Sequence, residues 1–276
     1  MGEDDLAHAL HPTDALAAGR WARRTGRPAI FSYMGLPSRR HLVARRLRAD
    51  VLLAAVRECT AVVALSATAA DGFRRTLGVR ARVIAPGVDL DAFTPSPGRA
   101  PTPEILCPAA AGQPAKRVDL LIEALARVRR SRPGTRLVLD LPRDRAVAER
   151  LRAAGADLVD LDDHEALRDA YRRAWVTALP SIGEAFGLVL VESMACGTPV
   201  VGSDVGAIPE VIGGPELGTT FSGDDPEAVA RALLEGLDLA QDPGTAAACR
   251  AHAGRYSAVR CADAYEALYR ELLDVG

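Results

Sequence analysis

Two glutamates and one lysine carry the clearest chemistry in this sequence. Glu184 and Glu192 are separated by seven residues that include the turn Phe186–Leu188, and Lys116 is the only lysine among 34 basic residues. A helix that begins at such a turn presents backbone N–H groups and the positive end of its dipole to an anion. Gly187 within the turn lets a ligand approach the backbone closely. This pattern indicates a site for a phosphorylated ligand.

The spacing of the two acids predicts which parts of the ligand they meet. Glu192 lies about five residues inside the expected helix, or about 7 Å along its axis, which is the reach from a phosphate to a nucleoside ribose. A carboxylate there can accept hydrogen bonds from two vicinal hydroxyls. Glu184, before the helix, would face the far end of a diphosphate, and an ammonium at Lys116 would offset charge on a leaving phosphate.

Each of these residues also has a structural interpretation. Glu192 could be a solvated residue of an amphipathic helix, Lys116 could be a chance survivor in an arginine-rich chain, and Gly187 could serve only helix–strand packing. The functional interpretation is stronger for the set than for any member, because the residues come from two loops that the expected fold brings together.

The expectation that these two loops lie together follows from the order of strands and helices along the sequence. After residue 103 the sequence alternates apolar strand signals with helical periodicity, which predicts an α/β fold with a parallel sheet. The expected strands are Glu104–Pro108, Arg136–Leu141, Asp157–Asp160, Trp175–Leu179, Thr198–Gly202 and Thr219–Phe221. The expected helices are Lys116–Arg130, Arg145–Arg152, Glu165–Arg173, Phe186–Cys196, Pro226–Leu239 and Cys261–Leu273.

Six such strands predict the open-sheet order 3-2-1-4-5-6, whose switch point lies between the first and fourth strands. Ligands bind there, outside the carboxyl ends of the strands. The two loops at this point are Ala109–Lys116 and Pro180–Gly187. The sequence therefore places the site on the loops that carry Lys116 and Glu184.

The first 95 residues form a separate region. They hold 14 arginines and 9 acidic residues, whereas the remainder holds 20 basic and 27 acidic residues, and the stretch Thr94–Gly98 between them is typical of a linker. Ala29–Tyr33, Ala61–Leu65 and Arg82–Ala85 are strand candidates. We expect residues 1–95 to form an incomplete Rossmann-like domain and residues 96–256 a complete one.

Composition excludes several classes of protein. A 49% hydrophobic chain with net charge −2 can bury real cores, and it has no apolar run near the roughly 20 residues that span a bilayer. The five cysteines are scattered without a Cys/His cluster, so we expect no metal site and a reducing bacterial cytoplasm. The pI of about 6.2 and the lack of a reading motif argue against nucleic-acid binding.

The segment EAFGLVLVESMACGTPVVGSDVGAIPEVI, residues 184–212, resembles the E-x7-E signature of glycosyltransferase family 4. Pro86–Phe93, Lys116–Leu125 and Ala174–Ser181 fit the same family, as do the last helices. The resemblance implies a GT-B fold of two Rossmann-like domains, with residues 257–276 crossing back to the N-terminal domain. It also implies transfer of a sugar from a nucleoside-diphosphate sugar to an acceptor hydroxyl with retention of configuration, without a metal or other cofactor.

The resemblance assigns roles residue by residue. Glu184 and Lys116 would act in catalysis, at the donor sugar and the diphosphate. Glu192 would bind the donor ribose. The remaining expected donor-binding residues are Ala185, Phe186, Gly187 and Leu188, which flank the helix start, and Arg117, which follows the lysine.

Three departures from the family pattern bear on activity. The Gly-Arg pair that usually precedes the lysine is Ala110-Ala111 here, and Met34 stands where a histidine often follows a strand. The family's N-terminal glycine-rich loop has no counterpart, so we expect a truncated acceptor half that begins near His11. The alternative function is therefore a catalytically inactive nucleotide-sugar-binding module or partner subunit.

The densest basic run is Arg39–Arg48. It could contact an anionic membrane at the inner face or a phosphorylated acceptor. The interpretation that we favour is a solvated arginine face on a helix that packs through Leu42, Val43 and Leu47.

Overall fold

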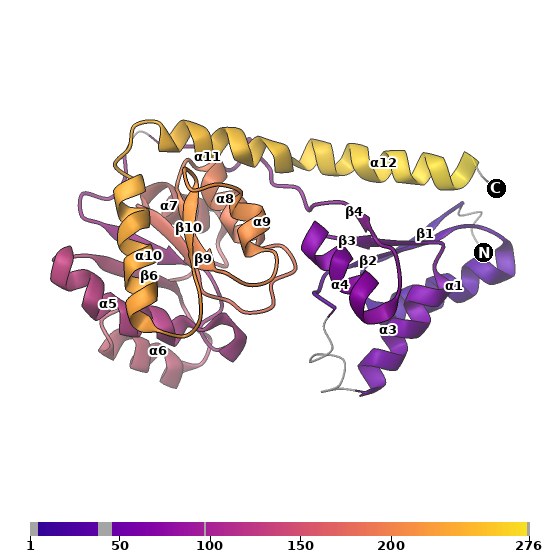
Figure 1. Cartoon of the computed structure of the whole chain (residues 1–276), viewed down its shortest axis with the longest axis horizontal. Coiled ribbons are helices and arrows are strands. Elements are labelled where there is room, and N and C mark those ends of the chain that lie inside the picture. Colours follow the sequence, from indigo (N-terminus) through magenta and orange to yellow (C-terminus); the bar gives the residue numbers. More distant parts are fainter. Residues whose placement is uncertain (1–4, 38–45, 97, 275–276) are drawn as a thin grey trace. The chain divides into compact units, whose positions relative to one another are not determined.

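The computed structural model describes residues 5–37, 46–96 and 98–274, which divide into two compact units (Figure 1). The first unit comprises the described residues up to Gly87, the short segment Glu184–Phe186, and the chain from Ala258 onward. The second comprises Val88–Gly183 and Gly187–Ser257. The side chains of the basic run Arg39–Arg48 lie outside the described part, so both interpretations of that run stay predictions.

The first unit is built on a parallel sheet, with four strands among the described residues in the order β1-β2-β3-β4. The strands are β1 (Ala7–Ala9), β2 (Ala29–Tyr33), β3 (Ala61–Ala64) and β4 (Arg82–Val83). The helices are α1 (Pro12–Thr25), α3 (Arg46–Glu58), α4 (Ala67–Leu77) and α12 (Ala258–Asp274). The three strands expected from the sequence are present, and β1 adds a fourth.

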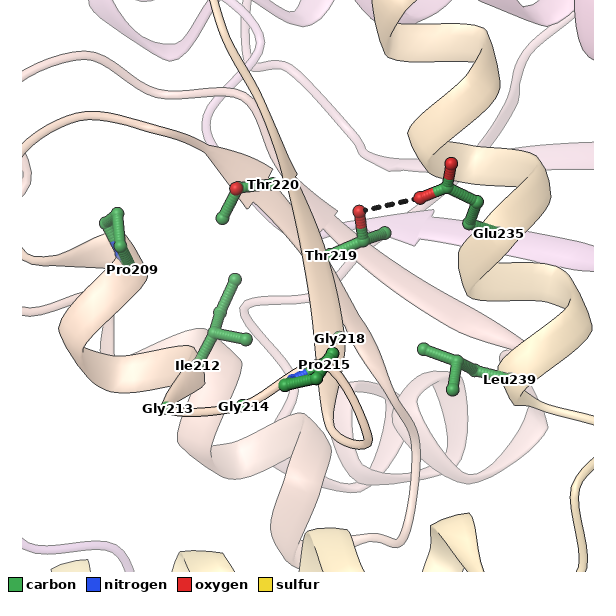
Figure 2. Close-up of a pocket in the computed structure, with 10 residues that line it drawn as sticks. All are labelled: Pro209, Ile212, Gly213, Gly214, Pro215, Gly218, Thr219, Thr220, Glu235 and Leu239. Atoms are coloured by element: carbon green, nitrogen blue, oxygen red, sulfur yellow. Dashed lines mark hydrogen bonds between the residues drawn. The ribbon is translucent and has the colours of Figure 1, made fainter.

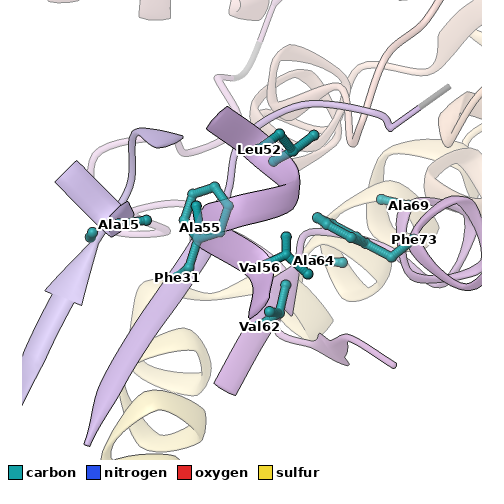
Figure 3. Close-up of a cluster of buried hydrophobic side chains, with 10 residues drawn as sticks. Ala15, Phe31, Leu52, Ala55, Val56, Val62, Ala64, Ala69 and Phe73 are labelled. Atoms are coloured by element: carbon teal, nitrogen blue, oxygen red, sulfur yellow. The ribbon is translucent and has the colours of Figure 1, made fainter. Parts of the chain in front are cut away.

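Alternate residues of the central strands bury the two faces of this sheet. Phe31 of β2 belongs to the cluster that α1, α3 and α4 form with the sheet (Figure 3). Its neighbour Ile30 belongs to a second cluster, with Val63, Ile84 and Leu268 of α12. The last helix therefore covers one face of the N-terminal sheet and completes its core.

A polar cluster adds to this attachment of α12. The imidazole of His8 on β1 lies 2.7 Å from the hydroxyl oxygens of both Ser32 and Tyr269, and Ser32 Oγ lies 2.9 Å from the hydroxyl of Tyr265. Burial lowers the pKa of His8, so the ring is held mainly in its neutral form. The cluster joins two strands to two turns of the helix.

We expect Leu268→Ala to reduce the free energy of unfolding of the first unit by about 2–4 kcal/mol, because Leu268 is only 3% exposed and its truncation leaves a cavity. Val259→Ala, at a position of the same helix that is 69% exposed, is the matched control and should change stability by less than about 0.5 kcal/mol. Urea unfolding followed by circular dichroism measures both. Equal effects would contradict the packing of α12 on this sheet.

The second unit contains a parallel sheet in the order β10-β9-β8-β5-β6-β7 across the described residues. Read in chain order this is 3-2-1-4-5-6, so the predicted topology is confirmed. The strands are β5 (Glu104–Cys107), β6 (Arg136–Asp140), β7 (Asp157–Val159), β8 (Val176–Leu179), β9 (Val200–Ser203) and β10 (Gly218–Phe221).

The helices of this unit are α5 (Val118–Ser131), α6 (Arg145–Ala153), α7 (His164–Arg173), α8 (Leu188–Ala195), α9 (Ile208–Ile212), α10 (Pro226–Leu239) and α11 (Thr245–Ala253). A 3-10 turn, Pro114–Lys116, precedes α5, and another, Gly254–Tyr256, follows α11. The predicted start of α10 is confirmed, with Asp225 accepting a hydrogen bond from the N–H of Glu227. Within the described part of the chain, no helix combines the length and apolarity needed to cross a bilayer.

Two predicted helix starts are wrong by two residues, and both lie at the site. Helix α5 begins at Val118 rather than Lys116, and α8 begins at Leu188 rather than Phe186. The residues just before them, Arg117 and Gly187, have φ of 49° and 96°. A right-handed helix cannot include such a residue, so each helix starts after it.

Candidate functional site

The two loops predicted to form the site are bonded to each other at the carboxyl edge of the second sheet. Strands β5 and β8 are neighbours, and the loops that follow them start side by side. The N–H of Ile182 donates to the carbonyl of Ala115 at 2.9 Å, and Nε of Arg117 donates to the carbonyl of Pro180 at 2.7 Å. The switch point of the sheet is therefore a braced pair of loops.

The N-terminus of α8 opens directly from one of these loops. Gly187 is its N-cap, and a glycine has no side chain with which to cap the helix. A Cβ at Gly187 would lie 3.3 Å from Leu179 and would also be strained at this φ, so a larger residue fits poorly. The first N–H groups of α8 are available to an anion.

Lys116 lies at the end of the facing loop. It closes the 3-10 turn, its N–H donates to the carbonyl of Gln113 at 2.9 Å, and its side chain is half-buried. Burial raises the pKa of the Cys107 thiol to about 12, while the N–H of Ala109 and the charge of Lys116 act in the opposite direction. The ammonium of Lys116 therefore lies within electrostatic range of the carboxyl end of β5.

Glu192 projects from α8 into a half-buried environment. The hydroxyl of Tyr171 donates to its Oε2 at 2.8 Å. Burial raises the pKa of Glu192, and the bond from Tyr171 and the charge of His164 partly offset that rise. The charges of Glu192 and Cys107 both act on the pKa of Tyr171, so the hydroxyl of Tyr171 lies within electrostatic range of the carboxyl end of β5 as well as of Glu192.

Glu184, Ala185 and Phe186 group with the first unit, whereas Lys116, Gly187, Leu188 and Glu192 belong to the second. The hydroxyl of Ser66, the N-cap of α4, donates to the carbonyl of Ala185 at 2.7 Å. Ala185 and Phe186 are buried and Glu184 is half-buried. The two predicted acids are thus held by different parts of the chain.

Arg117 is held by protein groups on two other loops and at the end of β10. Besides its bond to Pro180, its guanidinium donates to the carbonyl of Gly223 at 3.0 Å, pairs with Asp224 and lies 5.7 Å from the centroid of the Phe221 ring. It is also the one non-glycine residue with positive φ among the described residues. Its side chain therefore braces the loops after β5, β8 and β10.

Two functional features were missed at the level of sequence. Tyr171 was included in a helix without a role, although a tyrosine at the buried face of a helix usually needs a hydrogen-bond partner. Ser181 was included in a loop, and its Oγ is buried without a partner among the described residues. Such an atom is satisfied when a water or a ligand reaches it.

Two of the three departures from the family pattern, at Ala110-Ala111 and at Met34, lie on loops that the structure describes. Ala110 and Ala111 follow β5 and leave that loop without a cation before Lys116, and Met34 follows β2 and is 46% exposed. The described residues include no group of three or more histidine, cysteine or acidic side chains that could hold a metal ion. All five cysteines are free thiols.

Two hollows on the described part of the second unit are lined by none of the predicted site residues. Figure 2 shows one of about 490 Å³ at the outer edge of β10, where Thr219 donates to Glu235 at 3.1 Å. Pro209, Ile212 and Leu239 form part of its lining. A second, of about 280 Å³, lies beside Arg172 and Arg173.

Comparison with known proteins gives the class. A family model described as "Glycosyltransferase Family 4" matches residues 4–92, and one described as "Glycosyl transferases group 1" matches residues 102–238. Among solved structures, a sucrose-phosphate synthase from Thermosynechococcus elongatus superposes with a TM-score of 0.85 at 24% identity, covering 99% of this chain and 74% of that one. HepE from Anabaena, in complex with UDP, gives a TM-score of 0.83 at 21% identity over 96% and 79% of the two chains.

The chain belongs to glycosyltransferase family 4 and has the GT-B fold. Among its relatives, the D-inositol 3-phosphate glycosyltransferase of Segniliparus rotundus is 34% identical over an alignment of 215 residues that covers 70% of this chain and 47% of the relative. That of Geodermatophilus obscurus is 36% identical over 223 residues, covering 71% and 47%. The chain therefore spans about half the length of the relatives that it matches.

The raised pKa of Glu192 predicts that Glu192→Gln stabilises the protein at pH 7. A carboxyl whose pKa is higher in the folded than in the unfolded chain loses stability as pH rises from its unfolded pKa, about 4.3, through its folded pKa. The amide avoids this loss and still accepts the bond from Tyr171. Urea unfolding at pH 4 and pH 7 should show a gain at pH 7 that shrinks at pH 4; Glu149→Gln, an exposed site on α6, is the control.

The backbone of Arg117 predicts an unusual order of stabilities. Arg117→Ala and Arg117→Gly remove the same guanidinium contacts, but only alanine keeps a Cβ in the left-handed region. We expect the glycine variant to be more stable than the alanine variant by about 1 kcal/mol, the reverse of the usual order in structured segments. Thermal unfolding measures the difference. At Ala146, inside α6, glycine should instead be the less stable residue by about 1 kcal/mol.

Proposed function

We propose that this chain is a retaining glycosyltransferase that moves a sugar from a nucleoside-diphosphate sugar to an acceptor hydroxyl. The observation that carries the proposal is that the loop ending in Lys116 is hydrogen-bonded to the loop that leads into α8, the helix that carries Glu192, at the switch point of a family 4 chain. An ammonium, a helix start and a half-buried carboxylate are the three groups that a nucleoside diphosphate needs: two for phosphate and one for ribose.

Each residue then has a task. The N–H groups at the start of α8, beside Phe186, Gly187 and Leu188, bind the diphosphate, and Lys116 offsets the charge that develops on it as the sugar leaves. Glu192 accepts hydrogen bonds from the ribose hydroxyls. Glu184 lies three residues before Gly187, a span of at most about 11 Å of chain, so its carboxylate can reach the sugar of a donor bound there.

The first donor and acceptor to test are chosen from the ligands of a structural neighbour and the names of the relatives. UDP is the first nucleotide to test, because HepE was solved with UDP and with UDP-glucose. Inositol 3-phosphate is the first acceptor to test, because the relatives carry its name. The diphosphate is neutralised by Lys116 and backbone N–H groups in this proposal, so we expect turnover to persist when divalent cations are chelated.

A second candidate is a nucleotide-sugar-binding module without turnover. The specific observation in its favour is Ala111, which leaves the loop after β5 without the arginine that family members usually place there. A site with one cation instead of two binds a diphosphate but stabilises the charge of the leaving group less.

The proposal predicts how two substitutions change the affinities of the protein for UDP and for uridine. Lys116→Ala should weaken UDP by about 10- to 100-fold and leave uridine unchanged, because a charge-assisted contact to phosphate contributes about 1.5–3 kcal/mol. Glu192→Ala should weaken UDP and uridine alike, because both carry the ribose. Titration calorimetry measures all four affinities, with GDP and ADP run in parallel.

Arg145→Ala is the control for general loss of positive charge, since Arg145 lies on α6 with a side chain 91% exposed. It should change UDP affinity less than twofold at 0.15 M salt. If Lys116→Ala and Arg145→Ala behaved alike, the phosphate role would be lost. Sugar transfer from UDP-glucose to inositol 3-phosphate or water separates the candidates: donor binding without any turnover supports the module.

A further inference from the structure

Tyr171 is a fully buried tyrosine beside the proposed site. It lies in the last turn of α7 and is fully buried, in a cluster with Leu106, Val138 and Cys196. Its ring meets Phe93 edge-on, with centroids 5.9 Å apart. The hydroxyl of Thr198 donates to its carbonyl at 2.8 Å. Ring and backbone are therefore both fixed by the core.

The hydroxyl of this fixed ring points to one oxygen of one carboxylate. It donates to Oε2 of Glu192 at 2.8 Å. A carboxylate has room for about four hydrogen bonds, two at each oxygen. The bond from Tyr171 uses one of these positions and restricts rotation of the carboxylate, while Oε1 keeps its capacity to accept.

We propose that Tyr171 is the positioning residue for Glu192: its hydroxyl anchors Oε2 and thereby aims the carboxylate at the ribose hydroxyls of the bound nucleotide. This inference rests on the proposed function, because it assigns to Glu192 the ribose of a nucleoside diphosphate. Tyr171 itself does not touch the ligand. It restricts the orientations of the Glu192 carboxylate in the free protein, so that less conformational entropy is lost when the ribose binds.

Packing alone does not explain a tyrosine here. A phenylalanine would fill the same apolar cluster without placing a hydroxyl in it. Burying a hydroxyl costs free energy unless it has a hydrogen-bond partner. Burial and the charge of Glu192 raise the pKa of Tyr171 well above its ordinary value, so the hydroxyl stays protonated and donates at every working pH. The bond from Tyr171 favours the ionised form of Glu192 and partly offsets the effect of burial on its pKa.

The test compares a nucleoside diphosphate with its analogue lacking both ribose hydroxyls. Calorimetry with UDP, GDP and ADP first identifies the diphosphate that binds, and the 2′,3′-dideoxy form of that diphosphate is then the probe. We expect Tyr171→Phe to reduce the preference of the protein for the ribose form by about tenfold while leaving the affinity for the dideoxy form within twofold. A merely structural role would weaken both ligands equally.

Tyr265→Phe is the matched control. It removes the hydroxyl of another largely buried tyrosine, the one that lies 2.9 Å from Ser32 Oγ in the first unit. It should leave the preference for ribose unchanged. Thermal unfolding of both variants shows that the comparison is made between folded proteins.

A second variant keeps the inference testable if Tyr171→Phe does not fold. Glu192→Asp shortens the side chain by one methylene, retains the charge and withdraws the carboxylate from the hydroxyl of Tyr171. It should lose the preference for ribose as Glu192→Ala does, and adding Tyr171→Phe to it should change nothing more.

Full preference for ribose in Tyr171→Phe or in Glu192→Asp would overturn the positioning role and leave the proposed function intact. A wild-type protein that binds none of the three diphosphates would overturn both. Loss of preference in the two variants, with unchanged affinity for the dideoxy form, supports the inference.

Discussion

A hydrogen bond between two loops, from the N–H of Ile182 to the carbonyl of Ala115, is the contact on which the candidate site depends. At the switch point of an open parallel sheet the two neighbouring loops run to opposite faces, so nothing in the sheet itself keeps them together. This bond and the bond from Arg117 to Pro180 join them. Lys116 and the start of α8 are thereby fixed at the same edge.

The cost of this arrangement is concentrated where the ligand would bind. Arg117 occupies a backbone conformation that favours glycine, the carboxyl of Glu192 lies in surroundings that raise its pKa, and Ser181 buries a hydroxyl without a partner among the described residues. Local features of this kind are unfavourable for folding alone, and a structure retains them when the surrounding contacts over-determine them. Three of them around one pair of loops are better explained by binding than by packing.

The sequence was sufficient to predict the strand order of the second sheet but insufficient to predict the conformation and contacts of its loops. Strand order followed from alternation of apolar strands with amphipathic helices, which depends on periodicity alone. The starts of α5 and α8 were wrong, because a left-handed residue at Arg117 has no signature in an arginine and Gly187 was taken as the second residue of its helix. The assignment of Arg117 to the donor stays a prediction, and the contacts of its guanidinium with Phe221 and Asp224, more than 100 residues later, could not be foreseen from the sequence. The role of Tyr171 could not be predicted, because it depends on a hydrogen bond to Glu192, 21 residues away in the sequence.

Alanine at residue 111, where the family usually has an arginine, leaves Lys116 and the N–H groups of α8 as the groups proposed to meet a diphosphate. The N–H groups are fixed in the backbone of the helix and do not reorient when charge moves to the leaving oxygen. Preorganised dipoles of that kind stabilise a developing charge more effectively than solvated ions do, because they require no reorganisation at the moment of reaction. In the proposed function, the backbone of Gly187 and the start of α8 are therefore the fixed part of the site from which catalytic activity would arise.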